Sequence, residues 1–138
     1  MKEWKIPARL DRLSELLAAV GDTMREAGIS GKSQNSVMIA VEEIFVNIAS
    51  YAYAPGEGDA AVRLSANPKQ TVVEFRDGGM PYNPLARPNP DTSLSADERE
   101  IGGLGILMVK KLMDHVEYRY EDGMNVLRIE KSHDDAGR

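Results

Sequence analysis

The chain has 138 residues, which is the size of one domain, and this length can bury a sizeable core without disulfide bonds. A net charge of −5 argues against a nucleic-acid module, and the absence of cysteine excludes thiolate metal sites and cysteine nucleophiles. No apolar run resembles a signal peptide or a transmembrane helix, so we expect a cytoplasmic protein that binds neither nucleic acid nor membrane.

The sequence up to residue 28 predicts a strand and a helix. Residues 2–6 alternate loosely and end at a proline, which suits a short edge strand. Over residues 8–27, apolar side chains repeat at helical spacing while charged side chains occupy the other face. Gly28 stands where a helix of this length would stop.

A second helix is expected from a cap at Ser30 or Ser33 to about residue 54, and it carries Glu43 and Asn47 one turn apart. One interpretation makes this pair the wet face of an ordinary helix. However, apolar residues also surround the pair, and asparagine is a poor helix former. An amide oxygen can ligate Mg²⁺ and a carboxylate can act as a general base, so a catalytic pair is the alternative.

Two strands are expected near residues 60–66 and 71–76, and the second leads into Asp77 and Gly79. This segment can be a simple Asp-Gly turn. It can also be an adenine site, because a carboxylate accepts a hydrogen bond from the exocyclic amine of adenine, whereas guanine carries a carbonyl there. Gly79 would then let the backbone approach the base closely.

Residues 77–101 are rich in proline and lack periodicity, which is typical of a binding loop or lid. Helical spacing resumes at Gly103, in a glycine cluster with Gly102 and Gly105. Such a cluster can be a hinge. Three glycines at a helix start also expose backbone N–H groups that bind phosphate, although the spacing matches neither a Walker loop nor a Rossmann fingerprint.

The last expected elements are strands near residues 115–120 and 124–131, which form a hairpin around an Asp-Gly turn. The complete order predicts an α+β fold, a two-layer α/β sandwich in which helices cover one face of a mostly antiparallel mixed sheet. We expect residues 1–138 to form a single domain.

In this order the motifs resemble those of the Bergerat-fold (GHKL) ATP-binding family, which includes sensor histidine kinases and type II topoisomerases. Residues 41–53 are similar to its N box, residues 77–84 to its G1 box, residues 102–107 to its G2 box and residues 108–118 to the segment that follows. Within the family the chain looks most like the anti-sigma-factor serine kinases of the RsbW and SpoIIAB type. The similarity covers about residues 5–131.

The resemblance implies a role for each matching residue. Glu43 would be the catalytic general base, Asn47 the Mg²⁺ ligand, and Asp77 the adenine-binding carboxylate. The other implied nucleotide contacts are Tyr51, Gly79, Gly102, Gly103, Leu104, Gly105 and Ile106, with residues 82–101 as the ATP lid.

The resemblance also implies an ATP- and Mg²⁺-dependent serine kinase in bacterial transcription regulation. It would phosphorylate a STAS-type anti-anti-sigma protein, sequester a sigma factor and form a homodimer. Two departures favour an alternative, a nucleotide-dependent binding module without kinase activity. Tyr51 stands where these kinases usually carry histidine, and no threonine follows Thr92, so that Arg128 lies in about the place of the family's late-strand threonine. A third alternative is an α+β scaffold that binds no nucleotide.

Overall fold

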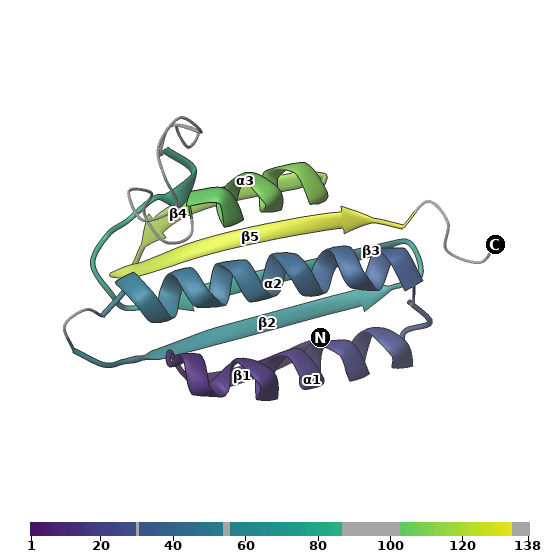
Figure 1. Cartoon of the computed structure of the whole chain (residues 1–138), viewed down its shortest axis with the longest axis horizontal. Coiled ribbons are helices and arrows are strands. Elements are labelled where there is room, and N and C mark those ends of the chain that lie inside the picture. Colours follow the sequence, from purple (N-terminus) through teal and green to yellow (C-terminus); the bar gives the residue numbers. More distant parts are fainter. Residues whose placement is uncertain (30, 54–55, 87–102, 134–138) are drawn as a thin grey trace.

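A computed structural model describes residues 1–29, 31–53, 56–86 and 103–133. Among these residues, five strands form one sheet, and three α-helices cover one of its faces (Figure 1). The elements in chain order are β1 (Lys2–Pro7), η1 (Leu10–Arg12), α1 (Leu13–Glu26), α2 (Gly31–Tyr51), β2 (Asp59–Asn67), β3 (Gln70–Asp77), η2 (Pro84–Ala86), α3 (Gly103–Leu112), β4 (His115–Glu121) and β5 (Met124–Ser132).

The sheet has the strand order β1-β2-β3-β5-β4, and every described pair of neighbours is antiparallel. The predicted two-layer α+β fold is therefore confirmed, with an antiparallel sheet throughout the described strands. Strand β5 lies between β3 and β4, which precede it in the chain. This arrangement places the end of β3 directly beside the start of β5, where Asp77 lies opposite Asn125.

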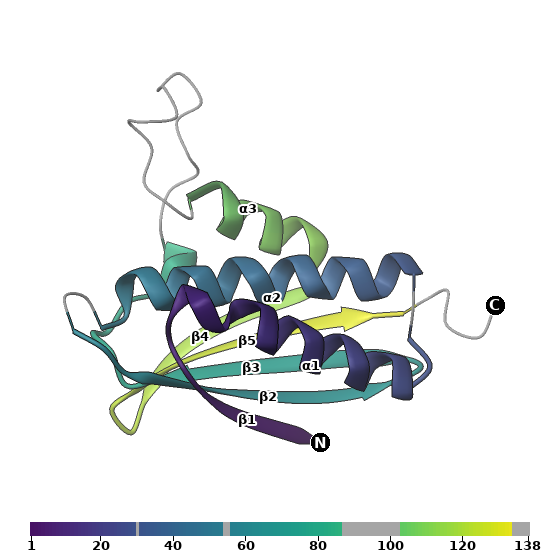
Figure 2. The ribbon, with the colours of Figure 1, turned by 60° about the horizontal axis from the view of Figure 1, so that its bottom comes forward.

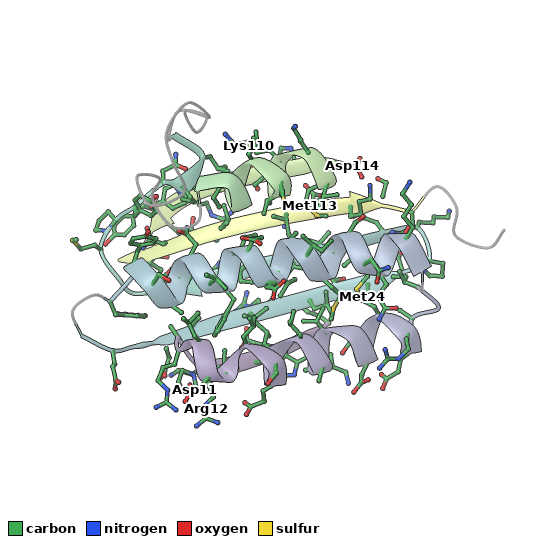
Figure 3. The ribbon with its side chains drawn as sticks, in the orientation of Figure 1. Asp11, Arg12, Met24, Lys110, Met113 and Asp114 are labelled. Atoms are coloured by element: carbon green, nitrogen blue, oxygen red, sulfur yellow. The ribbon has the colours of Figure 1, made fainter. Side chains whose placement is uncertain are left out.

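The core lies between the sheet and the helices, with α2 in the middle of the helical layer (Figure 2). Side chains of β3 alternate between buried and half-buried positions, as expected for a strand with one covered face. Met24 and Met113 fill the space on either side of α2 (Figure 3). Because α2 is flanked by α1 and α3, it is buried on more than its sheet-facing side, and this explains why polar residues within it are also buried.

The two expected helices of the first half begin at different places from those predicted. Residues 8–27 do not form one helix, because the backbone is still extended at Arg9 and a 3-10 turn, η1, precedes Leu13. Helix α2 has already begun at Gly31, so Ser33 lies inside its first turn and is not the cap. Ser30 lies outside the described residues.

The predicted stops and turns are confirmed where the backbone needs left-handed residues. Gly28, with φ of +84°, ends α1, and the N–H of Ile29 donates to the carbonyl of Met24 at 2.9 Å. Asp122 and Gly123 both have positive φ and join β4 to β5 in a tight hairpin. In the described part of the chain, we find no helix with the length and apolar character needed to cross a bilayer.

Candidate functional site

A pocket lies at the end of the sheet where β3 stops, beneath the C-terminal half of α2. The empty space among its lining residues, with open solvent included, is about 400 Å³. It joins the first two sequence motifs, because Asn47 and Asp77 both line it. The complete lining is Ile44, Asn47, Ile48, Tyr51, Ala52, Phe75, Asp77, Met80, Tyr82, Pro84, Tyr118, Asn125 and Leu127. Apolar walls with a few polar groups are typical of a small-molecule site.

Asp77 is the buried carboxylate of this pocket, with 5% of its surface exposed. Its Oδ1 accepts hydrogen bonds from the backbone N–H of Gly79 at 3.0 Å and from Nδ2 of Asn125 at 2.9 Å. Among the described residues, both of these bonds reach Oδ1, so Oδ2 remains as an acceptor for a ligand. This geometry fits the adenine-binding role predicted for Asp77, which stays a prediction.

Asn125 is a pocket residue that the sequence analysis missed. Strand pairing places it opposite Asp77, and it is only 7% exposed. Arg128, which was placed in about the position of the family's late-strand threonine, does not face Asp77 in the structure. Arg128 lies opposite Glu74 and forms a 3.7 Å ion pair with Glu130. The Asp122–Gly123 turn was the sequence signal from which Asn125 could have been found. This turn sets the start of β5, and Asn125 is the first buried polar residue of that strand.

Gly79 lies in close contact with the end of α2. A Cβ atom at this position would lie 2.1 Å from the carbonyl oxygen of Ala52, which is a backbone atom that cannot move aside cheaply. The same carbonyl accepts a hydrogen bond from the N–H of Met80 at 3.0 Å. From the sequence, Gly79 is expected to let the backbone approach a base closely. The structure adds that glycine is needed for packing of the loop against α2.

Tyr53 holds the Asp-Gly turn from outside the pocket lining, and it was also missed. Its hydroxyl donates to the carbonyl of Asp59 at 2.6 Å and accepts from the N–H of Gly78 at 2.8 Å. Burial raises the pKa of Tyr53, so the hydroxyl stays protonated and keeps its donor. The tyrosine therefore links the end of α2 to the residue that follows Asp77.

Asn47 is buried in α2, with 5% of its surface exposed. The interpretation of this position as a wet helix face is therefore wrong. Within the described residues its Oδ1 has no hydrogen-bond partner, although the atom is buried. A buried amide oxygen without a partner costs about 1–3 kcal/mol, so such an atom calls for an explanation.

Glu43 lies one turn before Asn47 and is half-buried against the first turn of α3. A Cβ atom on Gly105 would lie 2.0 Å from Oε2 of Glu43, so this glycine makes room for the carboxylate. Burial raises the pKa of Glu43, and the charge of neighbouring Glu42 raises it further. A carboxylate with a raised pKa is a better proton acceptor near neutral pH.

The glycine cluster is described in part. Gly103 and Leu104 begin α3, while Gly105 and Ile106 are buried in its first turn. Gly102 and the expected lid from residue 87 onwards lie outside the described residues. Helix α3 packs on α2, so the structure brings the start of the third motif to the Glu43 side of the first motif.

Two tyrosines form one wall of the pocket. The rings of Tyr51 and Tyr82 have centroids 6.3 Å apart at an interplanar angle of 42°. Tyr51 was predicted as a nucleotide contact, whereas Tyr82 was predicted only as the first residue of the lid. Aromatic walls of this kind suit a flat ligand ring.

The residues present fit a magnesium–nucleotide complex. Mg²⁺ in phosphate-transfer sites is held by one or two protein oxygens together with substrate phosphates and waters. The unpartnered Oδ1 of Asn47 is such an oxygen. Within the described ranges, no cluster of three or more histidine, cysteine or acidic side chains forms a metal cage, so the protein would offer only this small share of the ligands.

Comparison with known proteins relates this geometry to a family. Residues 6–131 match the family described as "Histidine kinase-like ATPase domain". Serine/threonine-protein kinase BtrW of Bordetella bronchiseptica is 26% identical over 102 residues, covering 72% of this chain and 71% of that protein. Serine-protein kinase RsbW of Listeria monocytogenes is 26% identical over 128 residues, covering 89% and 82%.

Solved structures share the fold at lower identity. The SiaB–SiaC complex from Pseudomonas aeruginosa matches with a TM-score of 0.61 and 16% identity, covering 96% of this chain and 89% of that chain. Histidine kinase AdeS of Acinetobacter baumannii matches with a TM-score of 0.53 and 11% identity, covering 97% and 68%. The resemblance expected from the motifs is confirmed, and the chain belongs to the histidine kinase-like ATPase domain family.

Proposed function

We propose that the protein is a single-domain, ATP- and Mg²⁺-dependent serine kinase that phosphorylates a STAS-type partner. The observation that carries this proposal is the pairing of the unpartnered Asn47 Oδ1 with Glu43 one turn away. The named relatives BtrW and RsbW, which are protein kinases, support it at the level of the family.

Each residue has a stated task in this proposal. When bound, Mg²⁺–ATP supplies the transferable phosphoryl group and neutralises its charge. Asp77 accepts from the adenine amine, and Asn47 ligates the metal through Oδ1. Glu43 accepts the proton of the substrate serine as its oxygen bonds to the γ-phosphorus and ADP leaves.

The test is transfer of labelled phosphate from ATP to candidate STAS proteins by the wild type and by Glu43→Gln. We expect Glu43→Gln to bind ATP normally and to lose roughly 10²–10⁴ in transfer rate, because the general base is absent. Transfer at the wild-type rate by this variant would show that the base has been assigned wrongly.

A binding module without kinase activity is the second candidate. It is favoured by Tyr51, whose ring packs beside Tyr82 in the pocket wall where related kinases usually carry histidine. In the same assay a module would bind ATP and leave no phosphoserine on any partner.

Partners and location form the remaining part of the proposal. We propose a cytoplasmic homodimer that also sequesters a sigma factor and regulates transcription. The solved neighbour SiaB–SiaC is itself a complex of two proteins, which supports partner binding by this fold. Co-purification with candidate sigma factors, and the mass of the free protein by light scattering, test the two points separately.

A further inference from the structure

The side-chain amide of Asn125 connects three segments around the pocket. Its Nδ2 donates to Oδ1 of Asp77 at 2.9 Å and to the carbonyl of Met80 at 2.8 Å, with a longer contact of 3.5 Å to the carbonyl of Gly79. Its Oδ1 accepts from the N–H of Tyr82 at 3.0 Å and from the hydroxyl of Tyr118. The amide therefore joins the end of β3, the loop after it and strand β4.

The hydrogen-bonding capacity of Asn125 is used within the protein. An asparagine amide has two N–H donors and one oxygen with two lone pairs, and each of the four has a partner here. These partners also determine its orientation, because Tyr82 offers an N–H while Met80 offers a carbonyl. No donor or acceptor remains for a bound base, so Asn125 acts on a ligand through its neighbours.

The neighbour that matters for recognition is Asp77. An amide donor on Oδ1 restricts rotation of the Asp77 carboxylate. Oδ2 is then held toward the pocket, where an acceptor discriminates adenine from guanine. The same amide anchors residues 80–82, of which Met80 and Tyr82 line the pocket.

We infer that Asn125 is a positioning residue for adenine specificity, which acts by orienting Asp77 and by fixing residues 80–82 against the pocket. This inference rests on the proposed nucleotide-binding function.

The first experiment compares ATP and GTP binding by calorimetry for the wild type and Asn125→Leu. Leucine has a similar volume and none of the four hydrogen bonds. We expect the preference for ATP over GTP to fall by about tenfold to a hundredfold, which corresponds to one hydrogen bond to a charged group. An unchanged preference in folded Asn125→Leu would overturn the inference.

A second variant, Asn125→Asp, tests the same idea without relying on the first. At pH 8 two carboxylates would face each other across the Asp77 contact, and the donor to Asp77 would be lost. As the pH falls, a proton shared by the pair restores a donor. We therefore expect weak ATP binding relative to the wild type at pH 8, and recovery toward the wild-type value as the pH is lowered.

The groups that face this pair are Asp77 from β3, the Tyr118 hydroxyl from β4 and, through Gly78, the Tyr53 hydroxyl. Burial raises the pKa of both tyrosines, so neither titrates between pH 6 and 8. Taking the ratio of variant to wild-type affinity at each pH cancels the titration of ATP itself.

Asn67→Asp is the matched control, because Asn67 lies at the opposite end of the β2–β3 hairpin and is exposed. We expect its affinity ratio to be flat with pH. A purely structural role for Asn125 predicts a lower melting temperature with a flat ratio, and this result would overturn the inference. If calorimetry shows that the wild type binds no nucleotide, the proposed function itself is wrong. This result is obtained before any variant is compared, so it is distinct from a failure of the inference about Asn125.

Discussion

Two effects act in opposite directions on the charge of the Glu43 carboxylate. Its half-buried place against α3 disfavours its charge, while general-base catalysis needs the charged form. Because the folded-state pKa is raised, ionised Glu43 reduces stability at neutral pH, and this penalty disappears as the pH falls below the ordinary glutamate range. Loss of transfer in Glu43→Gln would therefore not come from unfolding.

The pH dependence of phosphate transfer should reflect this carboxylate. The rate should fall as the pH drops through the raised pKa of Glu43, because the protonated form accepts no proton. Glu42→Gln removes the second cause of the raised Glu43 pKa. The acidic limb of the pH–rate profile should therefore move to lower pH. Single-turnover rates from pH 4.5 to 8 measure the limb. Glu15→Gln on the exposed face of α1 is the control, and a limb that stays in place in Glu42→Gln would contradict the assignment.

The contact between α2 and α3 is the feature that matters at the scale of elements. The helices approach so closely at Gly105 that only a residue without a side chain leaves room for the Glu43 carboxylate. The first motif thus depends on the third through packing, in addition to any shared ligand.

Gly105→Ala should separate folding from catalysis. The added methyl group meets the movable end of Glu43, and alanine favours a helix over glycine by about 0.5–1 kcal/mol, so stability should change by less than about 1 kcal/mol. Transfer should fall by roughly tenfold to a hundredfold, because a displacement near 1 Å misplaces the base. Denaturant unfolding and single-turnover transfer measure the two effects.

Gly21→Ala on α1 is the matched control, since its added Cβ would meet only ordinary contacts of 3.4 Å or more. Its transfer rate should equal that of the wild type. Equal rates in Gly105→Ala would show that Glu43 does not need its present position.

Local patterns in the sequence predicted most elements, because these depend on near neighbours. The apolar repeat of α2, the alternation of β3 and the Asp122–Gly123 turn all report local geometry. The half-buried place of Glu43 depends on α3, which lies more than 50 residues later, and the place of Asn125 depends on pairing with β3. Such distant contacts leave no local signal. Glu43 and Asn47 could be singled out from their spacing within one helix, whereas the amide beside Asp77 could not.

At the scale of the whole molecule, the uncovered face of the sheet is a charged surface. Glu74 lies there within 4.0 Å of Arg63, 2.8 Å of Arg76 and 3.7 Å of Arg119. Burial alone would raise the pKa of Glu74, but the hydrogen bond from Arg76 and the arginine charges together lower it. The two faces of the sheet therefore differ sharply, with the pocket lined by Asn47 and Asp77 on the helix-covered side.

Binding of nucleotide should stabilise the whole fold, since the pocket joins α2, β3, β4 and β5. At a concentration of Mg²⁺–ATP about 100 times the dissociation constant, stability should rise by about 2.7 kcal/mol. For a chain of this length that is a melting-temperature increase of roughly 9 °C. Thermal unfolding with and without Mg²⁺–ATP measures it, and Asp77→Asn should lose most of the increase. No increase in the wild type would favour the scaffold without nucleotide.

The strand order has a consequence for synthesis of the protein. Asp77 gains its partner Asn125 only when β5 inserts between β3 and β4, and β5 is translated last of the five strands. On the ribosome, β1, β2 and β3 can pair with one another while β3 still has an open edge. A nascent chain therefore cannot join Asp77 to Asn125 until residues 124–132 have left the exit tunnel.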